Sequence, residues 1–223
     1  MTSFSVPNRE PVVLDDQRLL PTQSTWQELS AKRLFDLTVA GIVTITVLSW
    51  LIPLIALIIR LTSKGPALYV QVRSGQDGRQ FQCLKFRTMT YNPQAKFVQA
   101  TRFDHRVTRV GRVLRRTNLD ELPQFLNVLA GHMSIVGPRP HPLPLDAQYW
   151  DTMPGYAERY RVKPGITGLA QVRGCRGETS KPFQMAHRVR YDHLYIRRQS
   201  ITLDARICWW TVKTALKGNP NAW

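Results

Sequence analysis

The feature that most constrains this 223-residue chain is an apolar stretch, residues 37–59, that contains no charged side chain. At about 1.5 Å per residue, a helix of this length crosses a hydrocarbon core of about 30 Å. The alternative is a buried core helix, but a soluble domain of this size rarely surrounds such a length on all sides. We therefore predict a helix embedded in a membrane.

The flanks of this stretch indicate how the helix lies in the membrane. Basic residues stand on both sides of it: Lys32, Arg33, Arg60 and Lys64. The positive-inside rule therefore draws both ends towards the cytoplasm, which a simple span does not satisfy. Pro53 removes one helical hydrogen bond, and Ser49, four residues earlier, can help satisfy the freed backbone. We expect a re-entrant helical hairpin that bends at Ser49 and Pro53, with a true span as the alternative.

The charge balance predicts a polyanionic partner. The chain has 31 Lys and Arg residues against 15 Asp and Glu, a formal net charge of +16. Nucleic acid, an anionic membrane surface and phosphorylated substrates all fit this charge. Arginine greatly outnumbers lysine, which favours two-pronged contact with phosphate. The 3 cysteines lack metal-binding or disulfide-framework spacing, so a reducing cytosol is the expected setting.

The rest of the pattern predicts an α/β protein of the α+β kind, a mostly helical catalytic domain with one small β-hairpin. Residues 67–73 and 80–88 are rich in β-branched and aromatic residues, and the turn sequence SGQDG lies between them. Helical character is expected at residues 107–116, 119–129, 147–160, 182–198 and 201–216, and a bent, extended stretch at 162–173. We divide the chain into a flexible tail (1–31), the membrane helix (32–61) and a cytoplasmic catalytic domain (62–223).

The last predicted helix, residues 201–216, mixes apolar and basic side chains. It contains Trp209 and Trp210 beside Arg206, Lys213 and, just beyond it, Lys217. Such a helix can lie in the membrane interface, with tryptophan at headgroup level and basic residues towards anionic lipid. A core helix of the domain is an equally good interpretation.

Adjacent acids, Asp120 and Glu121, stand in the run RRTNLDELPQFLNVL. Thr117 or Asn118 can cap a helix whose first turn holds both acids, which would turn backbone N–H groups and the positive end of the helix dipole towards a bound phosphate. Asn118 and Glu121 also have the spacing of a capping box, so a purely structural role is open.

Several cations are candidate phosphate ligands. Arg115 precedes the acids, and Arg139 is held between two prolines that restrict its backbone. Lys85 and Arg87 alternate with apolar residues on a predicted strand, so both share one face. Alternatively, Arg139 is an ordinary turn arginine, and Lys85 and Arg87 lie on a solvated strand face.

Several long motifs occur together in the order of one family. KRLFD, TSKGPALYVQVRSGQDGRQF, LKFRTM, LDELPQFLNVLAGHMSIVGPRP and KPGITGLAQVRG resemble the bacterial monotopic polyprenyl-phosphate phosphoglycosyl transferases, often called sugar transferases. The resemblance extends from Lys32 to the C-terminus. Larger members carry further transmembrane helices and a further domain before this region, so the chain resembles the minimal catalytic unit. It departs from the family at the helix bend, where the usual Ser-Pro is Ser49-Trp50.

The resemblance implies transfer of a sugar-1-phosphate from a UDP-sugar to undecaprenyl phosphate, with release of UMP, at the cytoplasmic face of the bacterial inner membrane. In that family the aspartate of the Asp-Glu pair is the nucleophile and forms a covalent phosphosugar intermediate. It corresponds here to Asp120, and Glu121 is its dyad partner. Mg²⁺ bound by Asp120 and the substrate phosphates is the expected cofactor. Downstream glycosyltransferases and a second copy of the chain are the expected protein partners.

Sugar identity follows from two shorter motifs. GPRPH and CRGET look like those of members that transfer hexose-1-phosphate, such as glucose or galactose, for exopolysaccharide. The resemblance implies contacts of His141, Arg176 and Glu178 with the sugar or nucleotide. A polar loop that only closes the domain is the alternative.

Two other functions compete with this one. The charge and interspersed aromatic residues also fit a nucleic-acid-binding protein, but such a protein has no need of the uncharged stretch at residues 37–59. We therefore expect no nucleic-acid partner. A noncatalytic membrane adaptor that recruits glycosyltransferases is disfavoured by the intact Asp120-Glu121 pair and GPRP turn.

Overall fold

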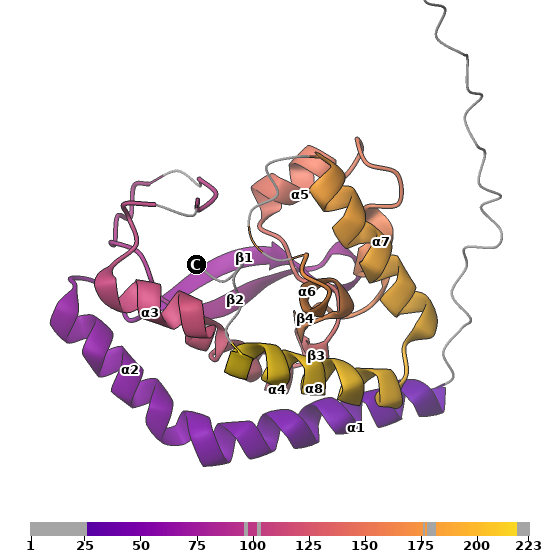
Figure 1. Cartoon of the computed structure of the whole chain (residues 1–223), viewed down its shortest axis with the longest axis horizontal. Coiled ribbons are helices and arrows are strands. Elements are labelled where there is room, and N and C mark those ends of the chain that lie inside the picture. The colour runs from indigo at the N-terminus through magenta and orange to yellow at the C-terminus, as the bar shows by residue number, and fades with distance from the viewer. Residues whose placement is uncertain (1–25, 96–97, 102–103, 176, 178–181, 218–223) are drawn as a thin grey trace, which may run out of the picture.

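A single helical run opens the computed structural model, which describes residues 26–95, 98–101, 104–175, 177 and 182–217 (Figure 1). The run consists of α1 (Trp26–Val43), the π-helical segment η2 (Thr44–Leu48) and α2 (Ser49–Thr62). Within the described residues, Ser30–Thr62 is the one helix long and apolar enough to cross a membrane.

The helical run bends between α1 and α2. Figure 1 shows α2 turning away from the direction of α1, so that the two helices enclose the rest of the molecule on their inner side. The π-helical segment lies upstream of Pro53, and both features are known causes of kinks. The Ser49 hydroxyl donates to the Ile45 carbonyl at 2.8 Å, and the Trp50 indole N–H donates to the Thr46 carbonyl at 3.0 Å. Two side chains therefore add hydrogen bonds to backbone carbonyls of the π-helical segment.

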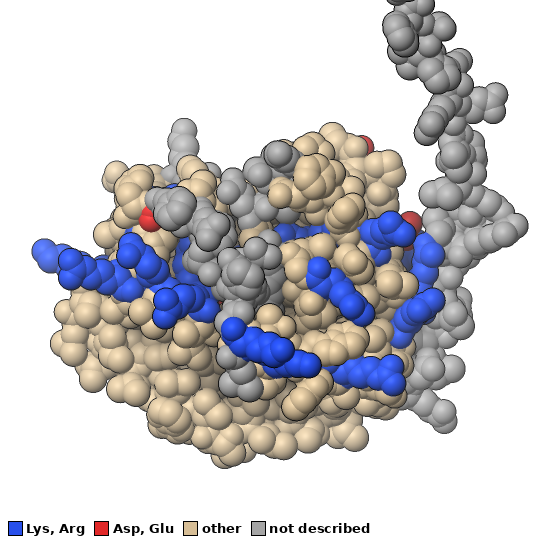
Figure 2. Space-filling model, viewed as in Figure 1, with Lys and Arg blue, Asp and Glu red and all other residues tan. Residues whose placement is uncertain are grey.

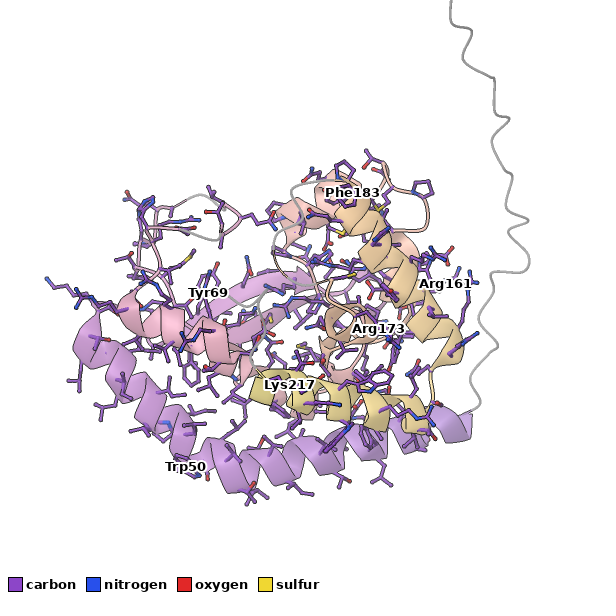
Figure 3. All side chains as sticks on the ribbon, viewed as in Figure 1. Trp50, Tyr69, Arg161, Arg173, Phe183 and Lys217 are labelled. Carbon is purple, nitrogen blue, oxygen red and sulfur yellow. The ribbon has the colours of Figure 1, made fainter. Side chains whose placement is uncertain are left out.

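The outer face of this helix is apolar and exposed. Ile45 is 75% exposed, Leu61 77% and Trp50 56%. Figure 3 shows Trp50 at the bend, on the side away from the rest of the molecule. An exposed apolar surface of this kind is unusual for a soluble protein and fits contact with lipid.

The predicted hairpin is confirmed. Strands β1 (Leu68–Ser74) and β2 (Gln80–Phe86) pair antiparallel, with Leu68 opposite Phe86 and Ser74 opposite Gln80. The turn between them contains the short helix η3 (Gln76–Gly78), in which Asp77 has φ 55° and Gly78 φ 72°. Asp and Gly are residues that tolerate this left-handed region.

The remaining elements differ in part from the prediction. They are α3 (Arg109–Thr117), η4 (Leu119–Glu121), α4 (Gln124–Leu129), β3 (Ser134–Val136), α5 (Leu143–Tyr149), η5 (Ala157–Arg161), β4 (Gly165–Thr167), α6 (Leu169–Val172), α7 (Pro182–Arg198) and α8 (Ile201–Lys217). The last two confirm predicted helices. The helix predicted at residues 147–160 is wrong, because α5 starts earlier and Pro154-Gly155, with Gly155 at φ 73°, separates it from η5. The stretch 162–173, predicted to be extended, contains β4 and then α6.

Strands β3 and β4 form a parallel pair that the sequence pattern did not predict. The pair places residue 137 directly against residue 165: a Cβ on Gly165 would lie 2.1 Å from the Gly137 nitrogen. Only glycine fits such a close backbone approach. The pair thereby fixes the start of the Gly-Pro-Arg-Pro turn that carries Arg139.

Two apolar clusters join the long helix to the domain. The first packs α1 against α4, β3 and α8 through buried residues that include Ala40, Val128, Val136 and Ile207. The second packs α2 against the hairpin and α3 through Ile55, Ile59, Ala67, Phe86 and Leu114. A third cluster, built on Tyr149, Tyr156 and Tyr160, joins α5 and η5 to α7.

A polar anchor supplements the first cluster. Lys32 on α1 pairs with Asp204 of α8 at 2.8 Å and with Asp36 at 3.2 Å, and it donates to Ser134 of β3 at 2.6 Å. A half-buried cation satisfied by several partners specifies one arrangement of the three elements. Helix α1 is thus fixed relative to the strand that leads into the Arg139 turn.

Helix α8 has two different faces. Asp204 and Ile207 are buried in the core, whereas Trp209 is 66% and Val212 51% exposed, and Arg206, Lys213 and Lys217 are exposed. In Figure 2 the Lys and Arg side chains form a band across this side of the molecule, above a lower rim without them, where Figure 1 places α1. The buried face of α8 fits the interpretation as a core helix, and the exposed face, with its tryptophan and basic residues, fits the interpretation as an interfacial helix.

Candidate active site

The two acids lie in the first turn after Asn118, as predicted, but this turn is a short 3₁₀ helix. Asn118 adopts the left-handed conformation (φ 57°, ψ 17°) and ends α3, and η4 then holds both Asp120 and Glu121 before α4 begins at Gln124. The predicted helix start at the acids is present only as this short 3₁₀ turn, which has Asn118 at its N-cap position. Electrostatic support for the acids comes from side-chain cations instead.

Glu121 is fixed between two cations from distant parts of the chain. The Lys85 ammonium on β2 donates to Oε1 at 2.9 Å. The Arg139 guanidinium donates Nη1–H to Oε2 at 2.9 Å and Nη2–H to Oε1, a two-pronged contact. Burial acts to raise the pKa of Glu121, but the charges and hydrogen bonds of Arg139 and Lys85 hold it well below the usual range. Glu121 is therefore a permanent anion with two bound cations.

Asp120 has the opposite electrostatic character. Burial and the neighbouring Glu121 charge raise the pKa of Asp120 to about 6, and Lys85, Arg115 and Arg139 offset part of that rise. Within the described parts of the chain, no Lys, Arg or His forms an ion pair with Asp120 within 4 Å. The two adjacent acids thus have pKa values driven apart, which is typical of catalytic pairs.

Arg115 and Arg87 have different environments. Arg115 on α3 donates Nε–H to the Thr88 hydroxyl at 2.9 Å, and the Asp120 charge opposes the lowering of its pKa by burial. Arg87 donates instead to the carbonyl and hydroxyl of Ser63 at 2.9 and 2.8 Å and to the Lys64 carbonyl, at the end of α2. The structure brings Arg115 towards the acids and engages Arg87 elsewhere, so phosphate binding by Arg87 stays a prediction.

The backbone of Arg139 is held by two buried arginines that the sequence interpretation missed. Arg73 on β1 donates to the Pro140 carbonyl at 2.6 Å, and Arg159 on η5 donates to the Arg139 carbonyl at 2.9 Å. Arg159 is itself paired with Asp192 of α7 at 2.8 Å, and both side chains are almost fully buried. A sequence signal did exist: Asp192 lies three residues from both Val189 and Tyr195, within the apolar stripe of its helix.

Arg188 of α7 is a second missed residue. It is 5% exposed, its Nη1 lies 3.1 Å from the His141 Nε2, and it donates to the Gly177 carbonyl at 3.2 Å. Burial and the charges of Arg159 and Arg139 lower its pKa to about 10, and its Nε–H has no partner within the described residues. This guanidinium therefore has unused capacity for an anion.

His141 is 2% exposed, so its predicted sugar contact stays a prediction. Burial, followed by the charges of Arg159 and Arg188, holds the pKa of His141 well below its usual value, so the ring is neutral. The other predicted sugar or nucleotide contacts, Arg176 and Glu178, lie outside the described residues.

The two acids and the cations around them line one cavity of about 1680 Å³. Its wall includes Asp120, Glu121, Lys85, Arg115, Arg139, Arg188 and His141, together with apolar residues from α1 and α8. A cavity with clustered cations and one carboxylate outside those ion pairs can bind a phosphorylated substrate and offer it a nucleophile.

The donor set fits Mg²⁺ only in company with a substrate. Within the described residues, no group of three or more His, Cys, Asp and Glu side chains could hold a metal by themselves. Mg²⁺ is commonly held by one or two carboxylates plus substrate phosphates and water, and Asp120 meets that need. Glu121 is already occupied by Lys85 and Arg139.

The chain is similar to several named bacterial proteins. A protein of Klebsiella pneumoniae named UDP-glucose:undecaprenyl-phosphate glucose-1-phosphate transferase is 50% identical over 182 residues, which are 81% of this chain and 39% of that protein. A protein of the same name from Caulobacter vibrioides is 48% identical over 186 residues, 83% of this chain and 69% of that protein. The exopolysaccharide production protein PSS of Rhizobium leguminosarum bv. phaseoli is 41% identical over 194 residues, 85% of this chain and 96% of that protein.

The chain therefore spans about two fifths of the Klebsiella relative but nearly the whole of the Rhizobium relative. Residues 26–218 match the family model described as bacterial sugar transferase. This match includes the acids, their cations and the long apolar helix, so the chain belongs to the bacterial sugar transferase family.

Proposed function

We propose that the protein transfers glucose-1-phosphate from UDP-glucose to undecaprenyl phosphate, releases UMP and thereby starts exopolysaccharide assembly. The observation that carries this proposal is the division of roles between the acids: Glu121 is locked between Lys85 and Arg139, while Asp120 has a pKa of about 6. The names of the Klebsiella and Caulobacter relatives support the substrates, and the name of the Rhizobium relative supports the polymer.

Asp120 acts as the nucleophile in the proposed mechanism. With a pKa of about 6, it is mostly ionised at neutral pH without strong stabilisation by an ion pair. One carboxylate oxygen attacks the phosphorus that bears glucose, and the bond from that phosphorus to the bridging oxygen breaks as UMP leaves with the electron pair. A phosphate oxygen of undecaprenyl phosphate then attacks the same phosphorus and releases the Asp120 carboxylate.

Glu121 acts as a positioning residue, because its low pKa prevents it from taking up a proton near neutral pH. An ammonium has three N–H donors and a guanidinium five, so Lys85 and Arg139 each have N–H groups beyond those given to Glu121 with which to meet phosphate oxygens. Fixed cations of this kind stabilise charge on the transferring phosphoryl group without reorganisation. Arg115 and Arg188 extend the same positive wall along the cavity.

Mg²⁺ would be held by Asp120 and the diphosphate, where its charge reduces the repulsion between the carboxylate and the donor. The membrane setting of the proposal is a re-entrant α1–α2 helix in the bacterial inner membrane, with the catalytic domain on the cytoplasmic side. The exposed apolar face of the helix and the exposed cations of α8 support contact with anionic lipid.

The test is UMP release by purified protein with a panel of UDP-sugars, Mg²⁺ and undecaprenyl phosphate. We expect turnover with UDP-glucose, and with the lipid omitted we expect one phosphosugar adduct on Asp120, detected by mass spectrometry. Asp120→Asn should lose both activities. Undiminished turnover by Asp120→Asn would overturn the assignment of Asp120 as the nucleophile. Absence of turnover by the wild-type protein with every UDP-sugar would favour the noncatalytic membrane adaptor.

A further inference from the structure

The cavity has two chemically different ends. At one end lie Glu121, Arg139 and the other charged groups of the proposed reaction. The other end is lined by apolar or weakly polar side chains from two helices: Val39 and Val43 of α1, and Cys208, Val212 and Ala215 of α8. We call this end the α1–α8 groove. The proposed reaction of Asp120 uses none of these residues.

The two ends are continuous through residues that directly follow the acids. Leu122 is the next residue after Glu121, and Phe125 follows on α4; both line the cavity and are half-buried. Ile135 of β3 and Ile166 of β4 also line it, and both belong to the same apolar cluster as Phe125, Val39 and Cys208. An apolar path therefore starts at the catalytic turn and runs towards the membrane helix.

The groove leaves apolar surface open. Val39, Val43 and Cys208 are only half-buried, Val212 is 51% exposed and Ala215 is exposed. Covering apolar surface is favourable by about 25 cal/mol per Å², so such a groove favours an apolar occupant over water. Figure 1 shows α8 lying along α1, and Figure 3 places Lys217 at the end of α8 that faces α3. The groove is thus bordered by the same helix that presents its outer face to lipid.

The occupant follows from this continuity and from charge. A ligand that reaches both ends needs a phosphate for the cations near Glu121 and a long hydrocarbon chain for the groove. We propose that the α1–α8 groove binds the isoprenoid chain of the polyprenyl phosphate acceptor, with its phosphate directed towards Asp120. This inference rests on the proposed function, since it assigns a place to the acceptor of that reaction.

The first test fills the groove. Ala215→Trp places a large side chain in it, and Ala205→Trp is the matched control, because Ala205 is also an exposed alanine of α8 but does not line the cavity. Loss of contact with roughly two methylene groups corresponds to about a tenfold change in affinity. We expect Ala215→Trp to raise the KM for undecaprenyl phosphate about tenfold and to leave the KM for a ten-carbon prenyl phosphate unchanged. Ala205→Trp should change neither.

Equal effects of Ala215→Trp on both acceptors, or no effect on either, would overturn the proposal. Formation of the Asp120 adduct from UDP-glucose without lipid checks that each variant is folded. It also separates the two claims: a wild-type protein that forms no adduct contradicts the proposed function, whereas normal adduct formation with an unchanged KM contradicts only the groove.

The second test needs no turnover. Ala215→Cys and the control Ala205→Cys are labelled with a maleimide, and mass spectrometry reads each site separately from the native cysteines. We expect undecaprenyl phosphate to slow labelling at position 215 severalfold and to leave position 205 unaffected. Equal protection of position 215 by dimyristoyl phosphatidic acid would assign the groove to bilayer lipid. Absence of protection by undecaprenyl phosphate would show that the groove does not bind this acceptor. Either result overturns the proposal.

Discussion

Arg139 holds both carboxylate oxygens of Glu121, with Nη1 2.9 Å from Oε2 and Nη2 bonded to Oε1. This contact joins the turn after β3 to the turn before α4, and Lys85 adds the β-hairpin to the same carboxylate. One half-buried anion thus gathers three separate segments around the neighbouring Asp120. The consequence is that Glu121 governs both the position of the cations and the pKa of the proposed nucleophile.

Glu121→Gln should separate positioning from proton transfer. The amide keeps the shape but leaves Lys85 and Arg139 without their counter-charge, so we expect kcat to fall by a factor on the order of 10²–10³. The negative charge that helps to raise the pKa of Asp120 is also removed, so the acidic limb of the pH profile should move to lower pH. Glu158→Gln, outside the cavity, is the control. An acidic limb that stays in place would contradict the electrostatic coupling.

The first half-reaction should depend on pH through Asp120. The attacking carboxylate must be ionised, and burial together with Glu121 raises its pKa to about 6. Adduct formation should therefore be constant above about pH 7 and fall roughly tenfold per pH unit below about pH 6. Single-turnover UMP release between about pH 4.5 and 8.5 measures this limb. A rate that stays constant down to pH 4.5 would mean that Asp120 is not the titrating nucleophile.

The buried Arg159–Asp192 pair should matter for stability and for activity in different ways. Arg159→Met leaves Asp192 buried without its partner, so the free energy of unfolding should drop by about 3–5 kcal/mol. The double variant Arg159→Met/Asp192→Leu should regain much of that loss, because no unpaired charge remains. Activity should stay low in both variants, since the Arg139 carbonyl loses its donor. Urea unfolding and UMP release measure the two effects, and recovery of activity in the double variant would remove the positioning role.

Local periodicity was sufficient for some parts of the fold. The uncharged stretch, the alternating strands around SGQDG and the two C-terminal helices each have a pattern that one element satisfies by itself. The bend was predictable from Pro53, although the π-helical segment just upstream of it was not. The association of Lys85 and Arg139 with the acids was predictable only as a set of candidates, since their distances depend on the tertiary fold.

Tertiary contacts determined the parts of the structure that local sequence patterns did not predict. The parallel β3–β4 pair is too short for a periodic signal and depends on the close approach of Gly137 and Gly165. Helix α3 ends at Asn118 because that residue takes the left-handed conformation, and the acids then lie in a short 3₁₀ turn that sequence periodicity did not distinguish from an α-helix. Strand alternation placed Arg87 beside Lys85, but Arg87 follows the end of β2 and turns to the carbonyls of Ser63 and Lys64.

The bent helix should place the N-terminus on the cytoplasmic side. The bend at η2 and Pro53, together with Arg33 and Arg60 on either side of the apolar stretch, favours entry and exit at the same membrane face. A cysteine added at the N-terminus should therefore resist a membrane-impermeant maleimide in intact cells and react after permeabilisation. Replacing Pro53 by Ala restores a backbone donor, but the π-helical segment remains, so we expect most of the protein to keep this topology. Labelling of the added cysteine in intact cells, in the protein that keeps Pro53, would show that the helix spans the membrane.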